Sequence, residues 1–155
     1  MDDRVPAHGR LAALDFGTVR IGVAVTDPEQ RFASPLEIHQ RGSPQADSRW
    51  LTELVRRESL CGFVVGLPIH TDGRESAKSQ EARHFAVWLR EITGLPVQLY
   101  DERFTTVEAD AFMVSTRTTR KKQKQRRDKL AAQILLTAFL ESTRDSASDA
   151  RSLDG

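Results

Sequence analysis

The sequence predicts an α/β fold in which a mixed central sheet of about five strands carries helices on its faces. Short apolar runs alternate along the chain with longer segments whose apolar residues recur at helical spacing. The first two runs flank a short turn that contains a glycine, which favours an antiparallel hairpin. A later run is apolar almost throughout, as in a strand buried on both faces. At 155 residues the chain has the length of one domain.

The opening hairpin is predicted from residues 11–15 and 21–25, which are apolar and lie on either side of Phe16-Gly17-Thr18. Glycine at this place lets the backbone turn tightly and leaves room for a phosphate or a metal to approach. A third strand is predicted at residues 32–38. The hairpin adds antiparallel strands to the parallel strands expected from strand–helix alternation, so the sheet should be mixed.

Residues 43–58 are predicted to form an amphipathic helix, with Ser43 as its cap and Pro44 as its first residue. Residues 61–67 follow as a short apolar run that Pro68 ends, which indicates a central strand. The helix is recognised by the spacing of its apolar residues, which are Trp50, Leu51, Leu54 and Val55.

Residues 75–92 are predicted to form a second helix, because their apolar residues lie on one stripe and Gly94 provides a stop. Residues 97–100 form the next strand. A short helix is expected at residues 107–114, capped by Thr105 or Thr106.

Residues 115–125 are polar and without pattern, and residues 127–141 form the last amphipathic helix. We expect a flexible start over residues 1–9, one domain over 10–141 and a loose tail over 142–155, because both ends are too polar to offset the entropy of ordering. No run has the length of a signal peptide or a membrane span, so a soluble, cytoplasmic protein is expected.

Acids stand where apolar segments begin or end. Asp15 ends the first strand, Asp101 and Glu102 follow the strand at 97–100, and Asp128 falls in the first turn of the last helix. A structural role would explain each one alone: a turn acid, a solvated loop acid, or an acid that interacts with the helix dipole. Only one of Asp101 and Glu102 should share a side with Val97 and Leu99, because side chains alternate along a strand.

Small residues in the last predicted helix favour a short distance between two of these acids. Ala131 and Ala132 would let the last helix lie close to the sheet and bring the Asp128 carboxylate toward Asp15. Carboxylates without histidine or cysteine ligands suit Mg²⁺ or Mn²⁺ and not zinc. One or two such ions beside a phosphodiester can activate water and stabilise charge on the leaving oxygen, so the acids indicate a phosphodiester hydrolase.

The strongest block of positive charge leads directly into Asp128, although the net charge of the chain is only +1. Beside the acids, this block could bind a phosphate backbone without reading base sequence. Arg103 adds a cation next to the acids that follow the strand at 97–100. His70 is the one histidine to test for a substrate contact, with a solvated loop histidine as the alternative. The block consists of Arg117, Arg120, Lys121, Lys122, Lys124, Arg126 and Arg127.

Four ordered motifs resemble the YqgF/RuvX family, whose members are described as pre-ribosomal-RNA nucleases and Holliday-junction-resolvase-like proteins of the ribonuclease-H-like superfamily. The resemblance spans about residues 11–141. The motifs are Leu14-Asp15-Phe16-Gly17 with Arg20-Ile21-Gly22-Val23-Ala24, Val64-Val65-Gly66-Leu67-Pro68 with Asp72-Gly73, Asp101-Glu102-Arg103-Phe104-Thr105-Thr106, and Asp128-Lys129-Leu130-Ala131-Ala132 with Ile134-Leu135-Leu136.

The resemblance implies a ribonuclease-H-like fold, with Asp15, Glu102 and Asp128 as catalytic acids that bind Mg²⁺ or Mn²⁺. It implies action on the 5′ end of the small-subunit ribosomal RNA precursor, with the ribosome or its precursors as further partners, or cleavage of branched DNA at Holliday junctions. The residues expected to bind substrate are Arg20, Arg103, Lys121 and Lys122. Asp101 and Glu75 are both open as a fourth acid, and His70 stands where many relatives have an amide.

Two rival functions are considered beside the nuclease. An ATPase related to actin or sugar kinases would use the Asp15-Phe16-Gly17-Thr18 turn for phosphate, but it needs a second lobe that 155 residues do not supply. A non-catalytic RNA-binding module for ribosome assembly would keep the fold without the activity. A monomer and a homodimer both fit the sequence, and a four-way junction would favour the dimer.

Overall fold

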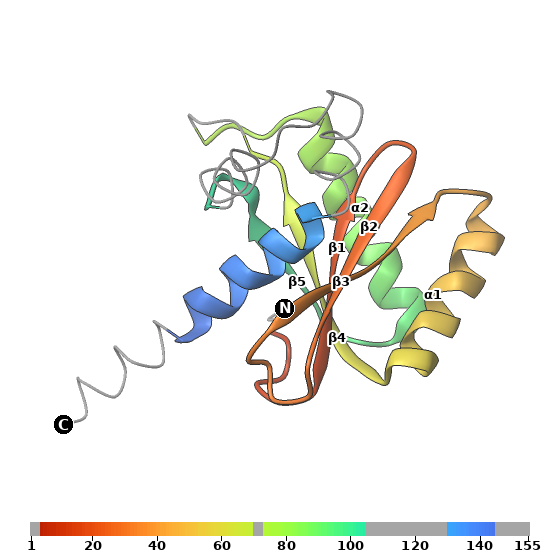
Figure 1. Ribbon diagram of the computed structural model, residues 1–155. Coiled ribbons are helices and arrows are strands. Elements are labelled where there is room, and N and C mark those ends of the chain that lie inside the picture. Colours follow the sequence, from red (N-terminus) through yellow and green to blue (C-terminus); the bar gives the residue numbers. More distant parts are fainter. Residues whose placement is uncertain (1–3, 70–72, 105–129, 145–155) are drawn as a thin grey trace, which may run out of the picture.

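The computed structural model describes residues 4–69, 73–104 and 130–144, and its described strands form one five-stranded sheet in the order β3-β2-β1-β4-β5 (Figure 1). β1 pairs antiparallel with β2, and β2 with β3, whereas β1 and β4, and β4 and β5, are parallel. The sheet is therefore mixed, as predicted. The strands are β1 (Arg10–Phe16), β2 (Arg20–Thr26), β3 (Ala33–Gln40), β4 (Leu60–Leu67) and β5 (Val97–Asp101).

The first helix, α1 (Pro44–Glu58), begins as the sequence predicts, with the Ser43 hydroxyl accepting a hydrogen bond from the Ala46 amide. The second helix, α2 (Ala77–Thr93), begins two residues later than predicted, because Ser76 caps it in a capping box with Ser79. It ends at Gly94, whose φ of 71° places it in the left-handed region. A 3₁₀ turn, η1 (Glu102–Phe104), follows β5 directly.

Two apolar cores lie on opposite faces of the sheet, as Figure 1 indicates by the helices on either side. Alternation along the strands divides the residues between them. The first core packs β-sheet residues against α1 and α2 and includes Ala12, Leu14, Val23, Val65, Leu51, Leu54, Phe85 and Leu89. The second packs the sheet against a helix at 130–144 and includes Leu11, Ala13, Ala24, Val64, Ala132, Leu136 and Phe139.

The central strand β4 is buried as its composition predicts, and Phe63, Val64 and Val65 have no exposed surface. Burying each such side chain contributes about 1.5–3 kcal/mol relative to leaving it in water. β4 separates the two cores, since Phe63 and Val65 face one and Val64 the other. This sheet is the rigid support for every side chain discussed below.

Residues on both sides of the predicted domain, 10–141, belong to the folded structure. The Val5 amide donates to Gln98 Oε1 at 3.2 Å, and Val5 packs against the second core. The last helix continues to residue 144, three residues past its predicted end. The predicted helix at 107–114 and the polar segment at 115–125 lie outside the described residues. Among the described residues, no helix is long and apolar enough to cross a membrane.

Candidate active site

Asp15 stands near the end of β1, on the sheet face that carries the helix at 130–144. Alternation places it with Leu11 and Ala13, which both belong to the second core. The turn that follows is tight, because the Gly17 amide donates to the Arg20 carbonyl at 2.9 Å. A Cβ atom on Gly17 would lie 2.7 Å from that carbonyl oxygen, so the turn requires glycine. The sequence prediction of a tight glycine turn is confirmed.

Glu102 reaches the same face from the other side of β4. It follows β5 and shares the alternation of Tyr100, which packs against the second core. Gly66 of β4 pairs with Tyr100, and a Cβ built on Gly66 would lie 3.0 Å from both Cγ and Cδ of Glu102. The Glu102 side chain therefore lies across a strand position that has no side chain of its own.

The two carboxyl groups share one electrostatic environment. Burial, the charge of Asp15 and a side-chain hydrogen bond with Asp15 together raise the pKa of Glu102 from its ordinary value of 4.5 to about 7, and burial has the largest effect. Asp101 adds a smaller repulsion, and the Lys78 ammonium partly opposes the rise. Two acids that compete in this way for one proton form a site that a divalent cation would stabilise.

Asp101 points to the other side and has a different role in the structure. Its carboxylate accepts hydrogen bonds from the Arg103 amide at 2.9 Å and from Arg103 Nε at 2.8 Å. These bonds lower the pKa of Asp101 against the opposing effect of its burial. Arg103, predicted to bind substrate, thus lies beside the acids with its charge already matched by Asp101.

Glu75, the other acid considered for a fourth position, is also matched by an arginine. Its Oε1 lies 2.5 Å from both Nε and Nη2 of Arg83, and its backbone forms a bridge with Ile69. Both candidates for a fourth acid are therefore occupied in ion pairs. The choice between Asp101 and Glu75 stays open as a prediction.

Arg20 lines a groove together with Asp15. Alternation along β2 places Arg20 on the same face as Ala24 of the second core. The groove has a volume of about 230 Å³ and includes Thr18 and Val19 of the turn. Of the four residues predicted to bind substrate, Arg20 and Arg103 lie in the part of the chain that the structure describes.

The remaining predicted site residues, Asp128, Lys121, Lys122 and His70, lie outside the described residues. The described helix begins at residue 130, and Ala132 is fully buried in the core beneath the acids, which fits the close packing predicted from small residues. Over residues 4–69, 73–104 and 130–144, no group of three or more potential metal-ligating side chains is found. The structure brings two predicted acids together and leaves the third untested.

Sequence reasoning missed Gly66 as part of the site. Gly66 stands only within a motif in the sequence prediction, although it follows the bulky run Phe63-Val64-Val65 at the position that pairs with Tyr100. A glycine in a central strand often marks close approach of another group, and that signal was available. Lys78, which lowers the pKa of Glu102, was not singled out either.

The described part of the chain is thus a mixed sheet that brings two acids together near the ends of β1 and β5, the arrangement expected of a ribonuclease-H-like fold. The fold of *Thermus thermophilus* RuvC in complex with a Holliday junction substrate is similar, with a TM-score of 0.54 at 20% identity, over 88% of this chain and 97% of that one.

The chain belongs to the RuvX family, whose model, described as "Holliday junction resolvase", matches residues 9–142. A *Rhodopirellula baltica* protein named "Putative pre-16S rRNA nuclease" is 56% identical, over 92% of this chain and 83% of its own length. A *Koribacter versatilis* protein of the same name is 40% identical, over 91% of this chain and 92% of its own.

Proposed function

We propose that this chain hydrolyses phosphodiester bonds at the 5′ end of the small-subunit ribosomal RNA precursor, with Asp15, Glu102 and Asp128 as its metal-binding acids. The observation that carries the proposal is the apposition of the Asp15 and Glu102 carboxyl groups, where burial and then the charge of Asp15 raise the pKa of Glu102 to about 7. Relatives at 56% and 40% identity are named for this RNA substrate. Ribosomal precursors are accordingly the proposed partners.

The donor set fits Mg²⁺ or Mn²⁺. Carboxylate oxygens are what these hard cations prefer, and a cation between Asp15 and Glu102 would offset both the burial and the repulsion that raise the pKa of Glu102. When bound, such an ion lowers the pKa of water and stabilises charge on the leaving oxygen. The contribution of Asp15 and Glu102 is to hold two oxygens on a rigid sheet.

Cations of the chain would position the nucleic acid. Arg20 lines the groove beside Asp15, where its guanidinium can pair with a phosphate. Arg103 is held by Asp101, so we assign it a weaker contact with the nucleic acid than that of Arg20, one that orients the substrate. Lys121 and Lys122 are proposed to bind the phosphate backbone from the segment before Asp128.

The proposal is tested by incubating the purified full chain with Mn²⁺ and three substrates: precursor RNA, unrelated single-stranded RNA and a four-way DNA junction. We expect the precursor to be cleaved fastest. Asp15→Asn and Glu102→Gln should each cost more than the roughly 10–100-fold typical of lost outer-shell partners of a metal. Glu91→Gln, an exposed change on α2, is the matched control. Full activity in a well-folded Glu102→Gln variant would remove that carboxylate from the mechanism.

A second candidate function is cleavage of Holliday junctions, which the description of the matching family favours. The same experiment separates the two, because a junction resolvase should cleave the four-way substrate symmetrically and should act as a dimer. Metal-dependent cleavage of either substrate that is lost in Glu102→Gln would exclude a purely RNA-binding role.

A further inference from the structure

A second cleft opens on the sheet face opposite the acids. Its volume is about 500 Å³, and it is lined by residues from β1, the turn after β1, the loop before α1, and α2. Phe16 lines this cleft and Asp15 lines the groove on the other face, because consecutive residues of a strand point in opposite directions. Thr18 lines both. The cleft and the groove at Asp15 therefore meet at Thr18, in the turn between β1 and β2.

The floor of this cleft, which we call the aromatic cleft, is a platform of rings. Phe16 stacks on Phe85 with ring centroids 4.4 Å apart, and Phe85 lies 5.9 Å from Trp88. The Arg41 guanidinium lies 4.5 Å from the centroid of Phe16. Arg41 also donates to the carbonyls of Gly17 at 3.0 Å and Thr18 at 2.8 Å, which fixes its plane above the ring. Phe85 and Trp88 are tilted by 34° to each other, so the lining is a cluster of three rings with the Arg41 cation held over Phe16.

The rim of the aromatic cleft carries polar groups that are not used within the fold. Glu81 and His84 are exposed residues of α2 and, among the described residues, make no hydrogen bond or ion pair. Asp47, which also lines the cleft, is engaged instead: it accepts hydrogen bonds from the Gly42 amide and from His39, each at 2.9 Å. The cleft therefore offers a carboxylate and an imidazole to a ligand that stacks on its floor.

We propose that the aromatic cleft binds a nucleobase of the substrate strand, within a nucleotide or two of the scissile phosphate. A cleft of this size is suited to a small planar ligand. Stacking on aromatic side chains holds a base whatever its identity, and the edge of the base presents the donors and acceptors that Glu81 and His84 complement. This inference rests on the proposed function, since it takes the nucleic acid at the acid site as the source of the base.

Because the aromatic cleft adjoins the acid site, a nucleic-acid strand is favoured over a free nucleotide as its ligand. A phosphate in the groove between Asp15 and Arg20 would lie on one side of the turn, and the next base can cross Thr18 to reach the other. Proteins that hold single strands combine such a charged groove with stacking platforms. The arrangement would select substrates whose strand is unpaired beside the cleavage position.

Trp88 provides a direct test, because a base stacked beside it should quench its fluorescence. The full chain carrying Trp50→Phe, which leaves Trp88 as the single tryptophan, is titrated in EDTA with a short single-stranded RNA, a duplex RNA and GMP. We expect saturable quenching by the single strand, weaker quenching by GMP and none by the duplex. Glu81→Gln and His84→Ala should each raise the dissociation constant by about 5-fold or more, consistent with a lost hydrogen bond. Glu91→Gln, on the same helix but outside the cleft, should leave it unchanged.

Kinetics and binding to labelled RNA give independent readouts. In the cleavage assay Glu81→Gln and His84→Ala should raise KM more than they lower kcat. Equal RNA affinity in all variants by fluorescence anisotropy, with Trp88 unquenched, would overturn the inference even if cleavage is normal. Quenching by GMP with unchanged RNA affinity would overturn the strand assignment. Quenching by RNA in a protein that cleaves nothing would instead contradict the proposed function and support the cleft.

Discussion

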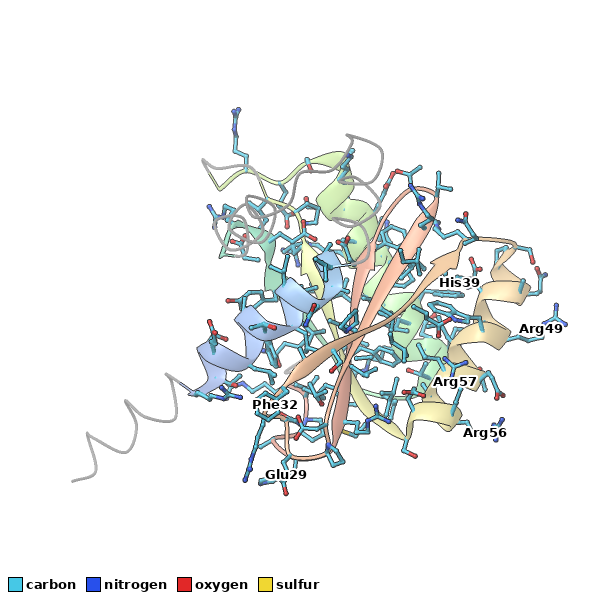
Figure 2. All side chains as sticks on the ribbon, viewed as in Figure 1. Glu29, Phe32, His39, Arg49, Arg56 and Arg57 are labelled. Atoms are coloured by element: carbon cyan, nitrogen blue, oxygen red, sulfur yellow. The ribbon has the colours of Figure 1, made fainter. Side chains whose placement is uncertain are left out.

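Glu102 and Asp47 are both partly buried carboxyl groups, on opposite faces of one sheet, and their pKa values shift in opposite directions. Glu102 faces Asp15, and burial together with that like charge raises its pKa to about 7. Burial also acts to raise the pKa of Asp47, but hydrogen bonds from His39 and the Gly42 amide outweigh it and lower the pKa. His39 itself stacks on Trp50 with ring centroids 3.7 Å apart, where β3 and α1 face each other (Figure 2).

The difference separates a structural acid from a functional one. The polar groups around Asp47 are satisfied by the fold itself, so nothing further is needed to stabilise its charge. Glu102 instead faces the like charge of Asp15, and a proton or a cation from outside the chain relieves this repulsion. A strongly perturbed acid beside a like charge is typical of a functional site.

The largest effect is expected from Gly66→Ala, which changes no charged group. The new Cβ would lie 3.0 Å from Glu102 Cγ and Cδ, so Glu102 must move away from Asp15. We expect nuclease activity to fall by about 10²-fold, because small displacements at a reacting centre are costly. The measurement is the cleavage rate at saturating Mn²⁺.

Gly62→Ala is the matched control for this variant. It lies on the same strand, and its Cβ would lie 3.0 Å from Val5 Cγ1 and 3.3 Å from Leu11 Cδ2, away from the acids. Both variants should lose stability to a similar degree, whereas only Gly66→Ala should lose activity. Equal activity of the two would show that Gly66 does not position Glu102.

The next effect is a gain in stability from Glu102→Gln in the absence of metal. The pKa of about 7 in the folded protein exceeds the ordinary value of 4.5, so the folded state holds its proton more tightly than the unfolded chain does. The contribution of Glu102 to stability therefore falls as pH rises from about 4.5 to 7 and is fully unfavourable above that range.

Removing the charge should therefore stabilise the protein at pH 8 by about 1–3 kcal/mol, with little change at pH 4. Urea unfolding in EDTA at both pH values measures the difference. Parallel stability curves for the wild type and the variant would mean that Asp15 and Glu102 do not repel each other in the folded state.

The opposite sign is expected for Asp47→Asn. The pKa of Asp47 lies below its ordinary value of 3.8, so its contribution to stability is present above that pH and is lost as pH falls through the folded value. At pH 7 the variant should lose about 1–2 kcal/mol, because His39 and the Gly42 amide keep a poorer acceptor. Thermal unfolding at pH 7 and pH 3 checks both points, and a loss of equal size at the two pH values would contradict the charge argument.

The sequence predicts the strands, the hairpin, the Ser43 cap of α1 and the Gly94 stop of α2 because each is encoded locally, whereas it did not identify the Ser76 cap of α2. The apolar run of β4, the Gly17 turn and the Ser43 cap depend on neighbours a few residues away. The choice between Asp101 and Glu102 is not local. It depends on which face of β5 meets Asp15, and therefore on the order of strands in the sheet.

The aromatic cleft and the role of Gly66 could not be predicted from the sequence pattern. Phe16, Arg41 and Trp88 come from three elements that no sequence spacing connects, and the sequence suggests only core packing for Trp88. Gly66 and Glu102 meet across two strands. Such contacts arise from tertiary packing, which periodicity and propensity do not record.

The smallest effect is expected from Glu37→Gln, which removes an acid of β3 that pairs with Arg57, a cation of α1. Glu37 of β3 lies 2.5 Å from the Arg57 guanidinium, but the two side chains are 33% and 45% exposed. Water and salt screen a pair of this kind, and ordering two long side chains opposes its attraction. The urea midpoint should therefore change within experimental scatter at 0.15 M salt, and slightly more at low salt. A loss of stability as large as that of Asp47→Asn would contradict this expectation. It would mean that pairing with a cation, and not burial with satisfied hydrogen bonds, is what distinguishes Glu37 and Asp47 from Glu102.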